Sequence, residues 1–526
     1  MEISSFTIIL IIIFVLLKKL IQKEDRIHRI NKNIPGPKSK FLFGNLFDLK
    51  GQVHEKINEW YEQYGSIYRI EFGSVSTVVL SEYSTLKEAF IDNGEIFQSR
   101  FQRKSRTACN KELNLANSNG EYFNHLKKTL ANEMTNQKMK KKEKIIKRQV
   151  FLLSEFFNEI SQQSPTNSGG ISKEPINNII KMYSLNVMLS LLFNIHFPYN
   201  SNSYQEELII TITRYFKSTG LPYPSDFIPT LYPFLKNKPK EYFEDYESVK
   251  KLITKITNDY QINHMLEINE NSTIEDIENY QPKNILESLL KQYKLKNISY
   301  DGVIGSLMDL ILAGSDTTGN TCLFSIVALV NNSNIQEKLF NEISNAFKDE
   351  DENDIDNENL NGANIITNNS SSLDNLSYFS DRIKTPYLVA FIKEVKRYYP
   401  SAPLSVPHLL TEDCEIQGYK ISKGTQIIQN IYSTHLSPSF CSNPLEFYPE
   451  RFLDSNNEPK IIPFGIGQRK CPGENIFEIE IYVFLVNLIK KFKLSHPIND
   501  NYQLNDRGQF GLSLQCPQFN IKVESR

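Results

Sequence analysis

One short segment combines a cysteine with glycines and cations in a pattern that could bind a metal. It reads FGIGQRKCPGE and spans residues 464–474. Pro472 and Glu474 are typical of the first turn of a helix, and an apolar stretch follows, so Cys471 is expected at a helix N-terminus. That position and the two cations before the cysteine should lower the pKa of its thiol, because each stabilises the thiolate. A thiolate is the form of cysteine that binds a metal ion.

The spacing of the six cysteines argues against several kinds of site. No C-x-x-C pair occurs, and no second cysteine or histidine stands near Cys471 at zinc spacing, which argues against a structural zinc site and a disulfide scaffold. A single thiolate can, however, be the only protein ligand of a haem iron. A redox-reactive cysteine or an acyl-transfer nucleophile stays open for Cys471. A buried inert thiol is the simplest interpretation of Cys109, Cys322, Cys414, Cys441 and Cys516.

The same segment resembles the haem-binding signature of the cytochrome P-450 family. The pattern F-x-x-G-x-R-x-C-x-G is filled by Phe464, Gly467, Arg469, Cys471 and Gly473. The resemblance implies haem b with the Cys471 thiolate as its axial iron ligand, and it puts Phe464, Gly465 and Arg469 beside the cofactor. It also implies a monooxygenase, which inserts one oxygen atom from O2 into a small lipophilic organic substrate.

A second motif, AGSDTT at residues 313–318, lies inside a long apolar helix pattern. Hydroxyl side chains there can bond back to the preceding turn, but a buried Asp316 needs a further reason. The block is similar to the family's oxygen-activation motif. On that resemblance Asp316 is the acid and Thr317 the alcohol of a proton relay to iron-bound dioxygen, and Gly314 leaves room for dioxygen. A purely structural role is the alternative.

A third motif, Glu394-x-x-Arg397, has both side chains on one helix face. An isolated pair of this kind is weak evidence, because surface ion pairs are common. With Arg451 downstream, the three residues resemble the family's Glu-Arg-Arg network. We expect them to pin the segment that leads to Cys471 and assign them a structural role.

Two positions depart from the family pattern. Where members carry W-x-x-x-R, this chain has Phe123 and Lys127, and lysine meets a carboxylate as a point charge rather than as a fork. His408 follows Pro407 where members carry arginine or histidine. The resemblance therefore implies haem-propionate contacts from Lys127, His408 and Arg469. A histidine satisfied within the small β region is the alternative for His408.

Hydrophobic periodicity predicts a mainly α chain with small β regions. A short helix is expected at 54–65, then a hairpin whose turn contains Gly73, and a small β region after Pro400. The resemblance implies the cytochrome P-450 fold, with haem between the helix of Thr317 and the helix after Cys471. Longer helices are expected at 177–193, 299–330, 335–347, 386–398 and 474–492.

The N-terminus is different in kind, since residues 3–17 are almost wholly apolar and lysines follow. We expect a single-pass membrane anchor at 1–20, short for a span, with the body of the protein in the cytosol and the endoplasmic reticulum as the membrane. A cleaved signal or a surface-lying helix is the alternative. A charged linker with a Pro35-Gly36-Pro37 elbow (21–37) and a catalytic domain (38–526) complete the chain. An Asn- and Asp-rich flexible insertion is expected at 348–375.

The formal net charge of the chain bears on which binding partners to expect. A formal net charge of −2 gives no reason to expect nucleic acid. The resemblance implies an NADPH-dependent cytochrome P-450 reductase, with cytochrome b5 as an optional second donor. Docking is expected at Lys127, Lys128 and Lys470, with the basic run 138–148 as a further candidate, although a solvated helix face is the simpler interpretation of that run. The substrate pocket is expected from 99–119, Met308, Ile311, Leu312, 404–406 and 510–512.

Overall fold

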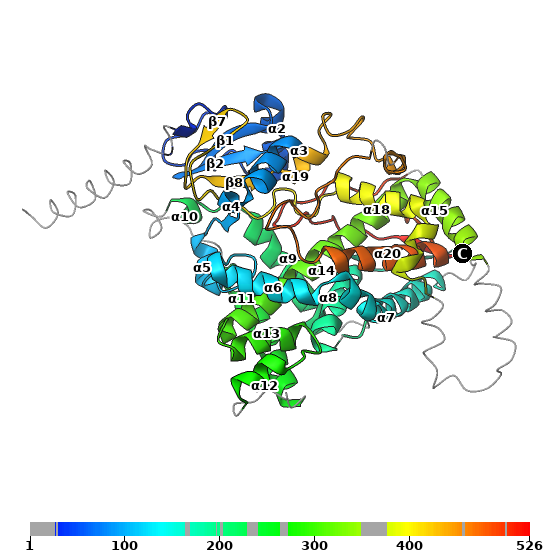
Figure 1. Cartoon of the computed structure of the whole chain (residues 1–526). Helices are drawn as coiled ribbons and strands as arrows, with labels where there is room; N and C mark the ends of the chain where they lie inside the picture. The colour runs from blue at the N-terminus through cyan, green and yellow to red at the C-terminus, as the bar shows by residue number, and fades with distance from the viewer. Residues whose placement is uncertain are drawn as a thin grey trace, which may run out of the picture.

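Helices make up most of the described chain, and the largest sheet gathers at one end of it (Figure 1). This computed structural model describes residues 27, 30–163, 169–195, 197–199, 203–228, 240–263, 272–348, 376–454, 458–499 and 502–526. The mainly α class with small β regions is therefore confirmed for these residues.

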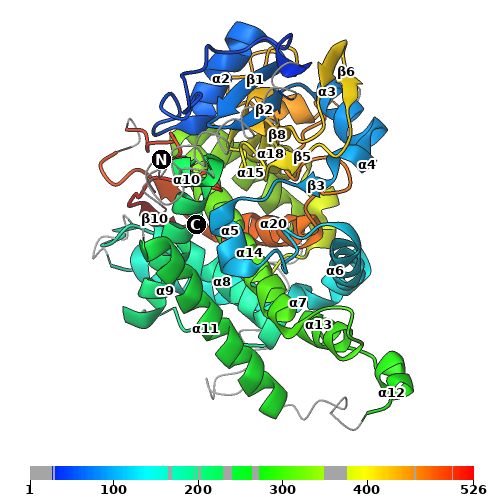
Figure 2. The same ribbon diagram turned by 90° about the vertical axis from the view of Figure 1, so that its left-hand side faces the viewer.

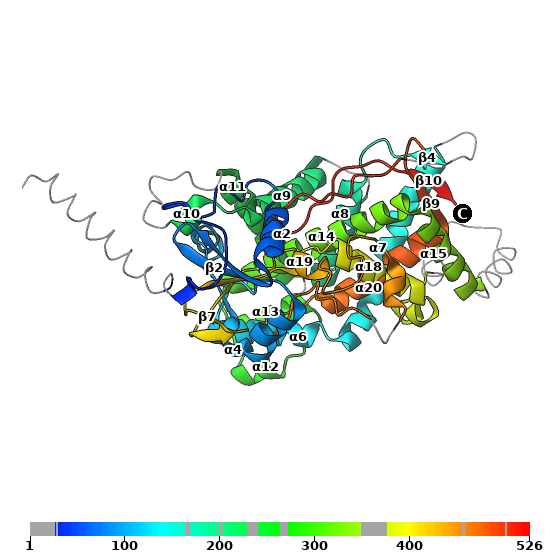
Figure 3. The ribbon, with the colours of Figure 1, turned by 90° about the horizontal axis from the view of Figure 1, so that it is seen from above.

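Helix α14 (Tyr300–Asn331) runs through the middle of the molecule and carries the predicted proton-relay motif. Its N-terminus is capped by Ser299, whose hydroxyl accepts a hydrogen bond from Gly302 N–H, as serine caps do. Almost every residue of α14 is buried, because α8 (Asn177–Phe193) and α20 (Glu474–Lys491) both pack against it (Figures 1 and 3). Helices that are apolar all round belong in a core, which fixes where the motifs on α14 and before α20 meet.

The five-stranded sheet has the order β1-β2-β8-β5-β3. The predicted hairpin is present as β1 (Ile67–Phe72) and β2 (Val75–Leu80), and Gly73 in its turn has a φ of +58°, which favours glycine. Strand β8 (Gln426–Gln429) runs parallel to β2. Strand β5 (His408–Leu409) then pairs antiparallel with β3 (Ser99–Arg100), so that His408 and Arg100 are direct partners.

The remaining elements surround this framework (Figure 2). The other helices are α2 (Val53–Tyr64), α3 (Tyr83–Lys87), α4 (Gly94–Phe97), α5 (Lys104–Asn110), α6 (Gly120–Glu133), α7 (Asn136–Ser161), α9 (Ser203–Gly220), α10 (Pro224–Phe227), α11 (Lys240–Asn263), α12 (Ile274–Asn279), α13 (Ile285–Lys294), α15 (Ser333–Ala346), α18 (Pro386–Tyr398) and α19 (Ile431–His435). Single turns of other helix types are η1 (Glu88–Asp92), η3 (Phe379–Lys384) and η4 (Pro449–Phe452). Two small sheets contain β4 (Gly170–Ile171), β9 (Phe492–Ser495) and β10 (Lys522–Ser525), and β6 (Cys414–Ile416) with β7 (Tyr419–Ile421).

The elbow at residues 35–37 does more than link two parts of the chain. The backbone N–H of Arg69 donates to the carbonyl of Pro35 at 2.8 Å. A Cβ on Gly36 would lie 2.0 Å from the Arg69 carbonyl oxygen, so only glycine permits this approach. The elbow is thus fastened to β1.

The predicted anchor at 1–20 and almost all of the predicted insertion at 348–375 lie outside the described residues. Among the helices that are described, none combines the length and the apolar character needed to cross a membrane.

The basic run 138–148 forms the first half of α7 and is only partly a solvated face. Lys140, Lys141 and Lys144 are exposed. Lys147, by contrast, is 2% exposed and its ammonium lies 3.3 Å from the centre of the Tyr378 ring. The cation therefore packs on an aromatic face inside the protein, which the charge pattern alone did not indicate.

Candidate functional site

The loop before α20 presents Cys471 at the start of that helix, as predicted. Its backbone N–H donates to the carbonyl of Phe464 at 2.9 Å, which closes the loop. Gly465 and Gly467 have φ values of +73° and +85°, a region that glycine adopts readily. A Cβ on Gly467 would also lie 2.3 Å from the Phe90 carbonyl oxygen. The glycines are therefore required both by their backbone angles and by the close approach of η1.

The thiol of Cys471 does not have the lowered pKa that its neighbours in sequence suggested. Burial raises the pKa, and the backbone N–H of Gly473 only partly offsets that effect. Lys470 contributes little because its ammonium pairs with Glu474 at 2.6 Å, and the Glu474 charge itself raises the pKa. The expectation was thus wrong in sign for the metal-free chain. A bound metal ion deprotonates a coordinating thiol directly, so metal binding does not depend on these cations.

Arg469 turns away from Cys471 and ties the loop to the segment before α6. Its guanidinium donates to the carbonyls of Gln98 at 2.8 Å and Ser118 at 2.6 Å. The same group lies 3.2 Å from the centre of the Phe123 ring. Burial lowers the pKa of Arg469 to about 10, because desolvation disfavours the charged form. A buried guanidinium that is bonded mainly to neutral carbonyls could still bind an anion.

On α14, Ala313 is exposed and Gly314 and Thr317 are half-buried, although the helix is otherwise almost fully buried. The Thr317 hydroxyl donates to the Ala313 carbonyl at 2.7 Å. This part of α14 therefore borders an open space. Gly314 was expected to leave room for dioxygen. A Cβ on Gly314 would instead point toward α8, where it would lie 2.6 Å from the Met188 sulfur. Its small size permits helix packing.

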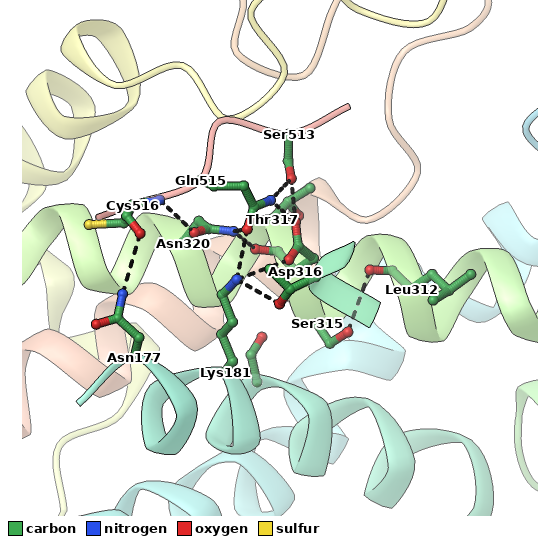
Figure 4. A network of polar contacts seen from close by, with 12 residues as sticks. Asn177, Lys181, Leu312, Ser315, Asp316, Thr317, Asn320, Ser513, Gln515 and Cys516 are labelled. Carbon is green, nitrogen blue, oxygen red and sulfur yellow. Dashed lines mark hydrogen bonds and ion pairs between the residues drawn. The ribbon is translucent and has the colours of Figure 1, made fainter. Parts of the chain in front are cut away.

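Asp316 faces away from this space into a buried polar network (Figure 4). Its carboxylate forms an ion pair with Lys181 of α8 at 3.3 Å and accepts from the Gln515 amide at 2.7 Å. It also accepts from the hydroxyl of Ser513. Lys181 in turn donates to the Gln515 side-chain oxygen at 2.7 Å. The structure thus joins three distant segments at one carboxylate, and it holds Asp316 and Thr317 on different sides of α14.

Sequence reasoning missed Lys181, Ser513 and Gln515. One signal was present, because a lysine inside the apolar pattern of residues 177–193 needs a partner. The two C-terminal residues carried no such signal, since they lie in an irregular segment that reaches α14 only in the folded chain.

The predicted Glu-Arg-Arg arrangement is present, with Glu394 and Arg397 fully buried and Arg451 partly exposed. Arg397 makes two hydrogen bonds to the two Glu394 oxygens, at 2.7 and 2.8 Å. Arg451 meets the same carboxylate at 3.2 Å. The two arginines also donate to carbonyls of the segment before η4, including Pro444 and Glu446. Such bidentate pairs fix geometry as well as charge, so the network holds that segment rigidly against α18.

Comparisons with known proteins decide which family this architecture represents. Residues 34–523 match the family described as Cytochrome P450. The chain is 85% identical to "Probable cytochrome P450 513D1" of Dictyostelium discoideum, over 97% of each chain. It is 37% identical to "Probable cytochrome P450 513C1" (96% of each) and 33% identical to "Probable cytochrome P450 514A2" (98% of this chain and 97% of the relative), both from the same organism.

The chain belongs to the cytochrome P450 family. It is therefore an oxidoreductase of the haem-thiolate monooxygenase type, and the family's cofactor is haem b with a cysteine thiolate as axial ligand.

The residues present fit a P450 haem. Cys471 lies deep in the protein, so that burial raises its pKa, and yet its side chain is accessible to solvent. Such a thiol leaves room for a bound group at its sulfur. Arg100 is buried and Arg469, in the same loop as Cys471, is half-buried, and neither forms an ion pair with a carboxylate among the described residues. Two such cations suit the two propionates of haem b.

Arg100 was missed by sequence reasoning, and His408 holds it in place. His408 Nδ1 donates to the Phe97 carbonyl at 2.7 Å, so its Nε2 must accept, and Arg100 donates to it at 2.6 Å. Burial and the Arg100 charge hold the pKa of His408 well below its usual range. A neutral histidine with both nitrogens engaged has no N–H left for a propionate. In this structure Arg100, rather than the expected His408, has N–H donors that an anion could use.

Lys127 is exposed on α6, and its ammonium lies 5.8 Å from the centre of the Phe123 ring. Phe123 therefore has cations close to it from both Arg469 and Lys127, with Arg469 much nearer. Lys127 forms no hydrogen bond within the part of the chain that the structure describes, so its ammonium stays available to an anion.

Glu480 of α20 is a buried acid of this P450 that lies outside the predicted proton-relay motif. Burial raises the pKa of its carboxyl to about 8, with a hydrogen bond from Ser184 acting in the opposite sense. The folded state therefore holds a proton that the unfolded chain loses above about pH 4.5. Because the folded state binds more protons, the free energy of unfolding should fall as pH rises from about 5 to 8, by up to about 1.4 kcal/mol per pH unit.

We accordingly expect Glu480→Gln to flatten this pH dependence and to raise the unfolding midpoint near neutral pH. Denaturant unfolding of wild type and variant at several pH values measures it. Glu478→Gln is the matched control, since that residue is partly exposed. Parallel pH profiles for wild type and Glu480→Gln would contradict the assignment.

Proposed function

We propose that this P450 inserts one oxygen atom from O2 into a small lipophilic organic substrate, with Cys471 as the thiolate ligand of its haem. The carrying observation is the accessible thiol at the start of α20, together with two cations, the buried Arg100 and the half-buried Arg469, that have no carboxylate partner among the described residues. Bound haem supplies the iron at which dioxygen is activated, and the thiolate donates electron density to it.

The surrounding residues orient the cofactor in this proposal. Arg100 and Arg469 bind the propionates, with His408 positioning Arg100, and Lys127 adds an exposed cation on α6. Phe464 and Gly465 form the part of the loop next to the thiolate. Their support is the set of contacts already described, in which every nearby acceptor of the two arginines is neutral.

Asp316 and Thr317 handle protons in the proposed reaction. The Thr317 hydroxyl borders the open space and can turn from the Ala313 carbonyl toward a bound molecule. Asp316 can pass on a proton only when its carboxylate leaves one of its present partners. General acid–base transfer of this kind typically contributes 10²- to 10⁴-fold to a rate.

The reduced, carbon-monoxide-bound spectrum of the full-length protein tests the central proposal. A thiolate-ligated haem gives a strongly red-shifted Soret band. A histidine-type band, or no bound haem, would refute it. Turnover with O2 and an electron donor, compared with turnover of an organic peroxide alone, then separates a monooxygenase from a haem-thiolate isomerase or dehydratase.

The same proposal covers the electron donor of this P450 and its location in the cell. We infer an N-terminal anchor at 1–20 in the endoplasmic reticulum membrane, with the catalytic part, residues 38–526, facing the cytosol. An NADPH-dependent cytochrome P450 reductase, with cytochrome b5 as an optional donor, would dock on the face formed by η1, α4 and the outer side of the Cys471 loop. A surface hollow lies there, and its charged lining is mixed: Lys87, Lys460 and Lys470 with Asp92, Glu95 and Glu474.

Lysines of α6 and α7 supply positive charge next to this docking face. Asn475 at the start of α20 donates to the Met134 carbonyl between those helices, at 2.9 Å, so both helices adjoin the Cys471 side. We expect Lys127→Glu with Lys128→Glu and Lys141→Glu to slow the first electron transfer about tenfold at low salt, and less at high salt, because charge steers association.

Stopped-flow reduction under carbon monoxide measures this effect. Lys251→Glu with Lys255→Glu, two exposed lysines of α11, is the control that changes net charge elsewhere. Equal reduction rates in the α6–α7 variant and wild type would remove these lysines from the docking surface.

A further inference from the structure

A cavity lies between α5, the end of α9, the strand β1 and a turn near the C-terminus. Its empty volume is about 490 Å³, including the part open to solvent. Apolar side chains from several segments form most of its wall, among them Val53, Phe72, Leu404, Ile428, Phe510 and Leu512. Segments 99–119, 404–406 and 510–512, expected from the sequence as substrate walls, all contribute to it, whereas Met308, Ile311 and Leu312 do not line it.

Two arginines, Arg103 and Arg106, are the charged residues of this wall among the described residues. They are only 8% and 6% exposed. Arg103 donates one long hydrogen bond, of 3.4 Å, to the Thr219 carbonyl, and Arg106 donates one of 3.4 Å to the Asn117 side chain. A guanidinium has five N–H donors, so most of their donors have no acceptor in the described chain.

The nearest carboxylates are occupied by other donors. Asp226 accepts from the backbone N–H and the hydroxyl of Ser105, both at 3.0 Å. Asp309 accepts from Asn114 at 2.7 Å and from the Ala116 N–H at 2.8 Å, and burial raises its pKa to about 6. Neither carboxylate lies within ion-pair distance of the two arginines. Burying a cation without such a partner is costly, and a bound anion would remove that cost.

We propose that Arg103 and Arg106 bind the carboxylate of the substrate, and that the apolar wall binds its hydrocarbon part. A carboxylate matches the planar fork of a guanidinium, which can hold both of its oxygens. The substrate class is therefore a lipophilic carboxylic acid. This inference rests on the proposed monooxygenase function, because it names the substrate of the same site.

The C-terminal turn connects this cavity to the reaction centre. Phe510 and Leu512 line the cavity, and the next residue, Ser513, bonds to Asp316 of α14. One short segment thus joins the cavity wall to α14, the helix that also carries Thr317. The arginines act as binding residues at a distance from the oxidised carbon, and not in the oxygen chemistry.

The test compares dodecanoic acid with dodecanol as ligands of the purified, haem-loaded full-length protein. Titration at about pH 8, where the acid is ionised, follows the ligand-induced change of haem absorption. A charge-assisted bond is worth about 1.5–3 kcal/mol, so the acid should bind at least about tenfold more tightly than the alcohol. Equal affinities for the acid and the alcohol would overturn the inference without need of any variant.

Two variants test whether Arg103 and Arg106 cause the preference for the acid over the alcohol. Arg103→Gln with Arg106→Gln should reduce the preference for the acid to within about twofold and leave the dodecanol affinity unchanged. Lys111→Gln is the matched control, because it removes an exposed cation of the same segment that pairs with Asp301 at 3.8 Å and does not line the cavity. A double variant that keeps the preference would overturn the inference.

Haem content and the carbon-monoxide spectrum are measured on every sample. A double variant that loses haem would assign the arginines to the cofactor and overturn the substrate assignment. A wild type with no thiolate-type band would refute the proposed function itself, whereas a normal band with no acid preference refutes only the inference drawn here.

Discussion

Replacing Cys471 with serine is expected to remove the red-shifted band of the carbon-monoxide complex and to lower turnover by at least about a thousandfold. A serine hydroxyl has a far higher pKa than a thiol and is a poor ligand for iron, so the electron donation that activates bound oxygen is lost. A loss of this size corresponds to about 4 kcal/mol in the activation free energy. Reduced difference spectra and turnover of the purified variant measure both effects.

Cys441→Ser is the matched control, because Cys441 is also a free and partly accessible cysteine. It should keep the wild-type spectrum and turnover. A thiolate-type band that survives in Cys471→Ser, or that disappears in Cys441→Ser, would mean that the wrong cysteine has been assigned.

The helices could be predicted well wherever a long apolar period and a helix boundary signal coincide. The predicted helices 177–193 and 386–398 have the bounds of α8 and α18, whereas α14 differs from its prediction by one residue at each end and α20 by one residue at its C-terminal end. Pro386 at the start of α18 is such a boundary signal. The long α9 and α11 were not predicted, because their polar and charged residues weaken the apolar pattern.

The site was predictable where a motif is local and much less so where partners come from distant segments. The loop at 464–474 is contiguous, and Glu394 and Arg397 are three residues apart. Arg100 and His408 instead meet through paired strands that lie 308 residues apart in sequence. The sequence alone does not reveal which strands pair, so it pointed to His408 as the donor to the anion and gave no sign of Arg100.

Charges near one another in sequence also misled the expectation for the Cys471 pKa. Lys470 forms an ion pair with Glu474, and Arg469 donates hydrogen bonds to carbonyls of another segment. Sequence neighbours act on a thiol only if their side chains stay beside it in the fold. The backbone N–H at the start of α20 does remain there, which is why the helix-start argument holds better than the argument from flanking cations.

Asp316→Asn is expected to lower turnover by about a hundredfold to a thousandfold while ligand affinity stays unchanged, because the amide cannot pass on a proton. The carboxylate also balances the buried ammonium of Lys181, whose side chain is only 9% exposed. Removing one partner of a buried ion pair typically costs 3–5 kcal/mol, so Asp316→Asn and Lys181→Met should each also lower the free energy of unfolding. A simple loss of activity would therefore not separate a proton relay from a structural role.

The double variant Lys181→Met with Asp316→Asn separates them. It leaves no unpaired charge, so it should recover much of the stability that either single change removes, and a double-mutant cycle measures that coupling. If Asp316 relays protons, turnover stays low in every variant that lacks the carboxylate, including the restabilised one. Turnover that returns together with stability would instead make Asp316 a structural partner of Lys181, and Thr317 would then have to act without it.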